Sequence, residues 1–185
     1  LVDVQLVAFP QEGILRDDGA DRLMDEALVM GADVVGGLPW YEYDDQDARR
    51  HIDICFALAK KFGRPIHMLV DDTDNPNSRS LEYLALATMR NGFQGKVAAS
   101  HCGALAAYDD THAAKVIGMV AEAGVSIVSN AHISLMMAGR YDHEPKRRGI
   151  TRVRELMAAG VNVASGQDDV FDPYYPFGKP DQLEV

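Results

Sequence analysis

The stretch PIHMLVDDTDNPNSRSLEYLALATMRNGFQGKVAASHC (65–102) contains two short apolar segments separated by one amphipathic segment. Residues 65–72 and 96–102 are rich in valine, isoleucine and small side chains, which is typical of parallel strands covered on both faces. Between them, residues 78–92 are predicted to form a helix that ends at Gly92. The stretch therefore predicts one strand–helix–strand unit.

The same unit recurs along the chain about every 30 residues. Further strands are predicted at 2–9, 33–39, 125–131 and 161–169, and further helices at 17–33, 45–63, 109–124 and 149–160. Strict alternation of strands and helices gives either an open doubly wound sheet or a (β/α)₈ barrel. No G-x-G-x-x-G or phosphate-binding loop follows the first strand, and the spacing is regular. We therefore predict an α/β fold of the TIM-barrel type, with about six of the eight βα units in this chain.

Two of the expected helices carry apolar residues on one stripe, which predicts the face that each helix buries. The stripes consist of Leu23, Ala27, Leu28 and Met30 in the helix 17–33, and of Ile52, Cys55, Phe56 and Leu58 in the helix 45–63.

Charge and composition narrow the class of protein. The chain has 185 residues and a net charge of −10, which argues against nucleic acid as a partner because phosphate binding needs a basic surface. No apolar run approaches the roughly 18 residues of a membrane-spanning helix. The two cysteines, Cys55 and Cys102, have no C-x-x-C spacing, and Cys55, which lies inside an apolar helical stretch, is interpreted as a buried thiol. We expect a cytoplasmic protein without a membrane partner.

Polar side chains end nearly every predicted strand, where a barrel would bring them to one face. These residues are Gln11, Glu42, Asp71, Asp72, His101, Asn130, His132, Asp168 and Asp169. Taken alone, Asn130 is typical of a turn and His101 of a hydrogen-bonded structural histidine. Histidine and aspartate at the ends of separate strands are, as a set, typical of a mononuclear hydrolytic metal site.

Six motifs carry a resemblance to a known family. They are AFPQEGI (8–14), GADVVGGLP (31–39), ASHCGAL (99–105), GRYD (139–142), PKRRGITRV (145–153) and GQDDVFDPYYPFG (166–178). Together they resemble bacterial cytosine deaminase and its relatives in the metal-dependent amidohydrolase superfamily. The resemblance implies that the six strands correspond to strands three to eight of the family barrel. It also implies one divalent metal, zinc or iron, which activates the water that attacks an aminated carbon of a small heterocyclic substrate.

The resemblance assigns a role to each matching position. Asp168 would be a metal ligand and would take the proton of the water, while His101 would orient that water. Asp72 stands where the family has a glutamate that carries protons to the ring. The substrate-binding positions would be Gln11, Asp169 and Tyr174, of which Gln11 would hydrogen-bond the ring amide.

Two departures from the family pattern bear on activity. The H-x-H pair of metal ligands is absent, because no two of the six histidines stand two residues apart. Leu69 occupies the position of a further metal histidine, and His67 would face the same side of the strand about 6.5 Å deeper. The metal ligands in this chain would then be Asp168 and, as alternatives, His101 or His67.

These departures leave several readings open. Residues 1–185 are expected to form a single barrel domain that lacks the family's N-terminal metal-binding strand. The protein is either a hydrolase of C–N bonds in a small heterocycle or a non-catalytic barrel that binds a ligand and holds no metal. An incomplete barrel would also expose sheet edges, so we expect a homo-oligomer.

Overall fold

The sheet of this protein is formed by strands that pair in the order of the chain. The computed structural model describes residues 3–147, 149–169 and 173. The strands are β1 (Val7–Ala8), β2 (Val34–Gly37), β3 (Ile66–Val70), β4 (Val97–His101), β5 (Ser126–Ser129) and β6 (Val163–Ser165). The helices are α1 (Ala20–Val29), η1 (Pro39–Tyr41), α2 (Asp45–Phe62), α3 (Ser80–Asn91), α4 (Ala104–Ala107), α5 (Asp110–Ala123), α6 (Ala131–Met137) and α7 (Val153–Ala158).

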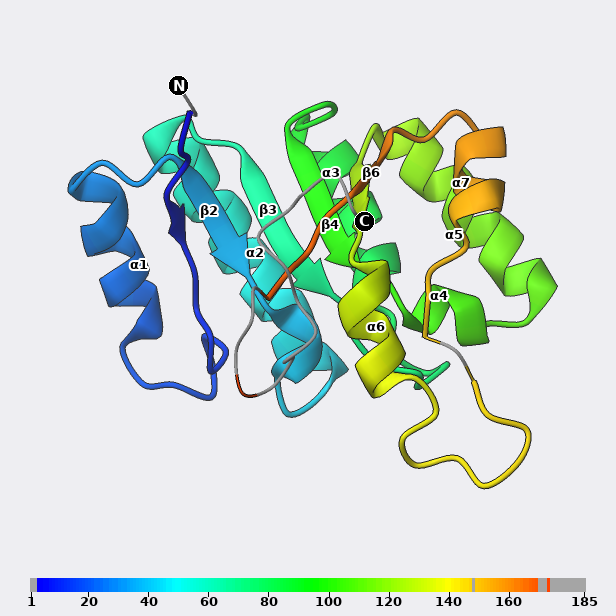
Figure 1. Ribbon diagram of the computed structural model, residues 1–185. Coiled ribbons are helices and arrows are strands. Elements are labelled where there is room, and N and C mark those ends of the chain that lie inside the picture. Colours follow the sequence, from blue (N-terminus) through cyan, green and yellow to red (C-terminus); the bar gives the residue numbers. More distant parts are fainter. Residues whose placement is uncertain (1–2, 148, 170–172, 174–185) are drawn as a thin grey trace.

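The strand order decides between the two predicted architectures. The six strands form one sheet in the order β1-β2-β3-β4-β5-β6, and each neighbouring pair is parallel. A doubly wound sheet reverses its strand order at a switch point, and this sheet has no such reversal. The sheet is therefore the wall of a TIM-type barrel, as predicted, and Figure 1 shows α2 and α3 lying behind it.

The two faces of the sheet differ in what they carry. In β3, Ile66, Met68 and Val70 are buried under the helices, where the main hydrophobic core lies. His67 and Leu69 alternate with them and are half-buried on the opposite face. That opposite face is the lumen side of the barrel wall, and it is where a barrel builds its site.

Helix ends follow the signals in the sequence. Asp44 accepts a hydrogen bond from the backbone N–H of Asp47 (2.8 Å) at the start of α2, and Asp109 accepts one from His112 (2.9 Å) at the start of α5. The long helix α2 ends at Gly63, whose φ of 65° only glycine adopts without strain. Both carboxylates lie where the helix dipole favours negative charge.

Several elements differ from the sequence-based expectation. The strand predicted at 161–169 is confined to β6 at Val163–Ser165, and the helix predicted at 149–160 to α7 at Val153–Ala158. The strand predicted at 2–9 is confined to β1 at Val7–Ala8, because only these residues pair with β2. The strand predicted at 125–131 ends at Ser129, and α6 follows it directly, which was not expected. The helix is only seven residues long, which is too short for a helical period to separate it from the strand before it.

The helix α1 buries a different stripe from the one predicted. Ala20, Met24 and Leu28 are buried, whereas Leu23 and Met30 are 55% and 88% exposed. The reason is that α1 packs against β1, β2 and α2 at the end of the sheet, and only one narrow row of its side chains contacts them. In α2, by contrast, Ile52, Cys55, Phe56 and Leu58 are all buried, as predicted.

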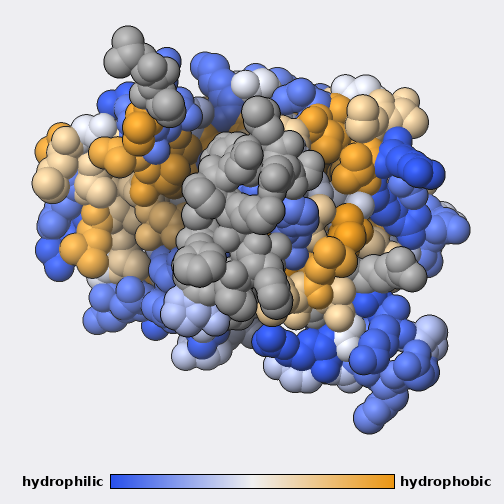
Figure 2. All heavy atoms as spheres, viewed as in Figure 1, coloured by the Kyte–Doolittle hydropathy of each residue, from blue (hydrophilic) through white to orange (hydrophobic). Residues whose placement is uncertain are grey.

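The edge at β1 is apolar in the described part of the chain. Val4, Leu6 and Val7 are exposed there, and Figure 2 shows hydrophobic side chains gathered near this end of the molecule. An apolar edge strand with unpaired backbone groups is a place where another strand can add. The expected self-association would use such an edge, and it stays a prediction. Among the described residues, none of the helices has the length and apolar character needed to cross a membrane.

Both thiols are expected to be unreactive in the folded chain. Cys55 and Cys102 are buried, and burial raises the pKa of each thiol, with the nearby carboxylates of Glu42 and Asp71 adding to the effect. A thiol reagent such as dithionitrobenzoate should therefore leave both unmodified near neutral pH. The same assay in guanidinium chloride should count two thiols per chain, and rapid modification without denaturant would contradict the buried placement.

Candidate active site at the carboxyl ends of the strands

The strand ends have unusual backbone conformations. Asp71 after β3, His101 at the end of β4 and Asp168 after β6 have φ values of 49°, 68° and 68°. Residues other than glycine rarely adopt positive φ, and such residues cluster at functional sites. In a strand, side chains alternate between the two faces of the sheet. A positive φ breaks this alternation, so the side chain at that position, or the one after it, points in a different direction.

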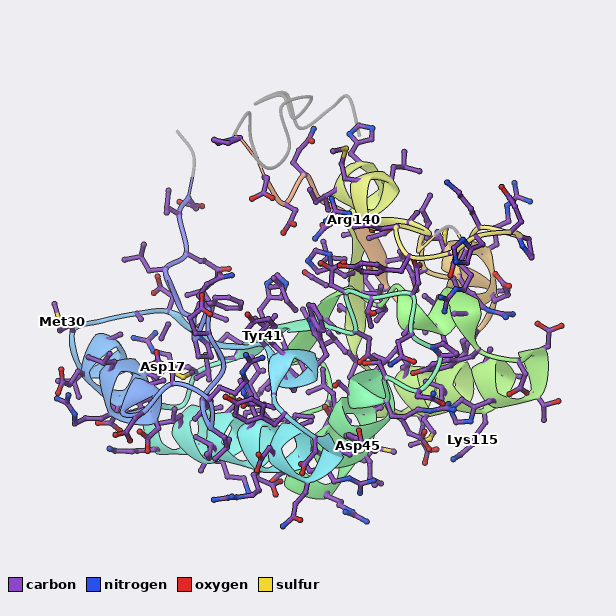
Figure 3. All side chains as sticks on the ribbon, turned by 90° about the horizontal axis from the view of Figure 1, so that it is seen from below. Asp17, Met30, Tyr41, Asp45, Lys115 and Arg140 are labelled. Carbon is purple, nitrogen blue, oxygen red and sulfur yellow. The ribbon has the colours of Figure 1, made fainter. Side chains whose placement is uncertain are left out.

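His101, at the end of β4, lies between two carboxylates, one that follows the neighbouring strand β3 and one that follows β6, two strands away. Its Nδ1 is 3.3 Å from Asp72 Oδ1, and its Nε2 is 3.5 Å from Asp168 Oδ1. The imidazole is only 1% exposed, whereas the side chains of Asp72 and Asp168 are 21% and 24% exposed. The structure thus brings together the three residues predicted to be catalytic. Figure 3 looks onto this end of the sheet, with Tyr41 on the side of η1 and Arg140 on the side of α6.

Burial and charge act in opposite directions on His101. Burial lowers the pKa of its imidazole, but contacts with Asp168 and Asp72 outweigh it and raise the pKa to about 9. The ring is therefore a cation at neutral pH, and it neutralises part of the charge of two neighbouring carboxylates.

Asn130 is a site residue that sequence reasoning assigned to a turn. Its amide nitrogen lies 3.2 Å from His101 Nε2, so this ring nitrogen has both a donor and an acceptor within reach. The Asn130 amide can donate to Nε2 only when this nitrogen carries no proton, whereas a protonated Nε2 points its N–H toward Asp168. Gly166 allows this arrangement, since a Cβ there would lie 2.6 Å from Asn130 Oδ1. The sequence feature that could have identified Asn130 as a site residue is its position directly after a strand.

Asp71 and Asp72 are neighbours with separate roles. The Asp71 side chain is buried and accepts hydrogen bonds from Ser78 Oγ (2.6 Å), Ser80 N (3.0 Å) and Leu81 N (2.9 Å) at the start of α3. Burial raises the pKa of Asp71 in spite of these three donors. One carboxylate thus anchors the loop after β3, and the next one, Asp72, faces His101.

The other residues predicted to belong to the site are Gln11, Asp169, Tyr174 and His67. Gln11 is exposed on the turn after β1, and Asp169 is half-buried directly after Asp168. Tyr174 lies outside the described residues. His67 Nε2 is 2.5 Å from Ser100 Oγ, and burial together with the charge of His101 lowers the pKa of His67. His67 is therefore a neutral, hydrogen-bonded side chain on the lumen face.

His101, His67 and Asp168 are the side chains that could bind one divalent metal. His101 Nε2 and Asp168 Oδ1 have the separation of two ligands that share a metal, which is about 3.4 Å for tetrahedral zinc. Leu69 offers no ligand, and residues 3–147, 149–169 and 173 contain no group of three or more side chains placed to hold a metal ion. Catalytic zinc usually has three protein ligands. The described residues therefore do not form a complete metal site by themselves.

Comparison with known proteins places the chain in a family. The sequence profile of the Amidohydrolase family matches residues 1–182. The chain belongs to the amidohydrolase family. Members of this family generally bind a divalent metal. The prediction from the six motifs is confirmed at this level.

Three amidohydrolases illustrate the similarity. Pterin deaminase of Rhizobium rhizogenes is 39% identical over the whole chain, which covers 42% of that protein. N-isopropylammelide isopropyl amidohydrolase of a Pseudomonas species is 27% identical, again with 42% covered. The crystal structure of 5-methylcytosine deaminase from Klebsiella pneumoniae, liganded with phosphonocytosine, is 40% identical, with a TM-score of 0.96 over 100% of this chain and 45% of that chain. The chain thus spans less than half the length of these relatives.

The charge state of His101 can be measured directly. In chelator-treated protein, the imidazole of His101 should titrate with a pKa of about 9, followed by the pH dependence of its ring proton shifts in NMR spectra. Replacing Asp168 or Asp72 by asparagine should lower this pKa, because each change removes a negative charge that stabilises the imidazolium. Asp45→Asn, which alters a carboxylate at the start of α2, serves as the control. A pKa for His101 that does not respond to Asp168→Asn would contradict the contact.

Proposed function

We propose that this protein hydrolyses the exocyclic C–N bond of a small aminated nitrogen heterocycle. Water would add to the carbon that bears the amino group, and ammonia would leave as the carbon becomes a carbonyl. The observation that carries the proposal is the buried imidazole of His101 between Asp72 and Asp168 at the strand ends of an amidohydrolase barrel. Relatives named for the deamination of pterin and of 5-methylcytosine support the choice of substrate class.

Each member of the cluster is suited to one part of the proton transfer. Asp168, which is partly exposed, is placed to take the proton of the attacking water as a general base. His101, as a cation, would hold the water by a hydrogen bond and balance the charge that develops. Asp72 would deliver a proton to the ring nitrogen and regain one from the hydroxyl group of the adduct as the carbonyl forms. The departing amine would leave as ammonia after receiving the proton that Asp168 took from water.

The substrate would be held by residues beyond this cluster. Gln11 carries an amide that can donate to and accept from a ring amide, which favours pyrimidine- or pterin-type rings. Asp169 follows Asp168 and would accept from a ring N–H or amino group. Tyr174 would line the pocket. These assignments follow the motifs AFPQEGI and GQDDVFDPYYPFG of the sequence.

A divalent metal would supply the acidification of the water that no described side chain provides. Asp168 would be one of its ligands, and the second would be His67 or, in its neutral form, His101. The described residues do not complete such a site, and the proton transfers proposed above use side chains alone.

A second candidate function is a barrel that binds a heterocycle without turnover. The specific observation in its favour is Leu69, an apolar side chain on the lumen face beside His101 and His67. Binding without ammonia release would distinguish this function from catalysis.

Ammonia release tests the leading proposal. Purified protein should release ammonia from cytosine or pterin, and Asp168→Asn should lower the rate about 100- to 10,000-fold, which is the range for loss of a general base. Asp110→Asn is a matched control, since Asp110 is 95% exposed and its side chain pairs with Arg152. No ammonia from either ring, with binding seen by calorimetry, would favour the non-catalytic barrel.

Metal content tests the role of Leu69. Elemental analysis of Leu69→His protein should show more bound zinc or iron than the unmodified chain, because the new imidazole would lie on the lumen face near His101 and Asp168. Leu23→His places an imidazole on the exposed side of α1 and should not change the metal content. About one metal per unmodified chain would instead mean that other residues complete the site. Equal metal content in the two variants would contradict a vacated ligand position.

A further inference from the structure

A buried pair outside the proposed catalytic cluster joins the end of η1 to α2. Glu42 Oε1 lies 2.6 Å from His51 Nδ1, and both side chains have no exposed surface. Burial of a carboxylate is unfavourable unless hydrogen bonds compensate for the lost water. Here the compensating hydrogen bonds come from backbone N–H groups of Leu38, Ile14 and Leu15.

The tautomer of His51 follows from its backbone partner. The N–H of Leu38 donates to His51 Nε2 at 3.0 Å, so this nitrogen carries a lone pair rather than a proton. The ring proton is therefore on Nδ1 and is donated to Glu42. The pair consists of a neutral imidazole and a carboxylate. Through His51, it links Leu38, which directly follows β2, and helix α2 to Glu42 Oε1.

That same oxygen also holds the loop after β1. Glu42 Oε1 accepts hydrogen bonds from the backbone N–H groups of Ile14 (2.6 Å) and Leu15 (3.1 Å). Burial alone would raise the pKa of Glu42, but the hydrogen bonds from His51, Ile14 and Leu15 lower it below its ordinary value. The carboxylate is thus ionised and accepts three N–H groups, an arrangement that stabilises the charged form.

The residues just before these two amides form a turn that carries Gln11. The N–H of Gly13 donates to the carbonyl of Pro10 (3.1 Å) and closes the turn over residues 10–13. Gly13 has a φ of 88°, and a Cβ there would lie 3.0 Å from Glu42 Oε1. Glycine therefore lets the turn rest directly on the carboxylate.

We propose that Glu42, oriented by His51, is a positioning residue that fixes the turn 10–13 and so presents Gln11 to the heterocycle. The inference rests on the proposed function, in which Gln11 binds the ring amide. Without this anchor the turn, whose Gln11 side chain is exposed, would sample more orientations. Binding would then lose the preorganisation of its amide contact.

Amide hydrogen exchange tests the anchor without any need for activity. Glu42→Gln keeps the shape of the side chain but removes its charge, and it should speed the exchange of the Ile14 and Leu15 amides about tenfold. The buried Ile66 amide, which donates to Lys96 O and joins the start of β3 to the segment before β4, reports on opening of the sheet and should not change. Glu12→Gln removes a charge from the same turn at an exposed side chain and is the matched control. Unchanged exchange at Ile14 and Leu15 would overturn the proposal.

Ligand binding tests whether Glu42 acts through Gln11. By calorimetry with cytosine and pterin, Glu42→Gln should weaken binding about fivefold in the otherwise unmodified chain and less than twofold in a Gln11→Ala background. Equal losses in the two backgrounds would show that Glu42 does not act through Gln11. If Glu42→Gln does not fold, Gly13→Ala provides a second route, since it pushes the turn off the carboxylate and should give the same two effects.

The two measurements separate the inference from the proposed function. A chain that binds neither cytosine nor pterin contradicts the proposed function, and the anchor is then decided by the exchange of Ile14 and Leu15 alone. Faster exchange with unchanged binding would keep the anchor but refute its role in presenting Gln11.

Discussion

Parallel pairing of consecutive strands is the constraint on which the rest of this structure depends. Because each strand pairs with the next one in the chain, every strand ends at the same edge of the sheet. Residues far apart in sequence therefore meet there, as His101 does with Asp72 and Asp168. The helices cover the other face, so among the described residues the side chains placed to form a site are those on the lumen face and in the loops at this edge.

Neighbouring carboxylates are separated in function by the backbone turns at the strand ends. Asp71 has a positive φ and turns its side chain into the start of α3, which leaves Asp72 to meet His101. Asp168 has a positive φ as well and meets the same imidazole from the other side. Two carboxylates that would repel each other are thus held around one cation, and the left-handed conformations are stabilised by these contacts.

Leu69 places an apolar side chain on the lumen face close to the proposed site. It occupies the lumen face between His67 and the strand end, where an apolar side chain can neither bind a metal nor move a proton. The cluster around His101 retains acid and base groups, while Glu42 and His51 support the turn of Gln11 on the other side of β3. The proposed hydrolysis therefore depends on how the water is activated, which the Leu69→His variant addresses.

The sequence by itself determined the alternation of strands and helices, the six strands and the polar residues at their ends, because periodicity and composition are local properties. The motifs also indicated the amidohydrolase family and the residues His101, Asp72 and Asp168. Only the tertiary structure decided that Asp71 anchors the start of α3, that Asn130 contacts His101, and that α1 buries Met24 rather than Leu23. These features depend on contacts between distant segments and on positive φ values at strand ends, neither of which a local pattern encodes.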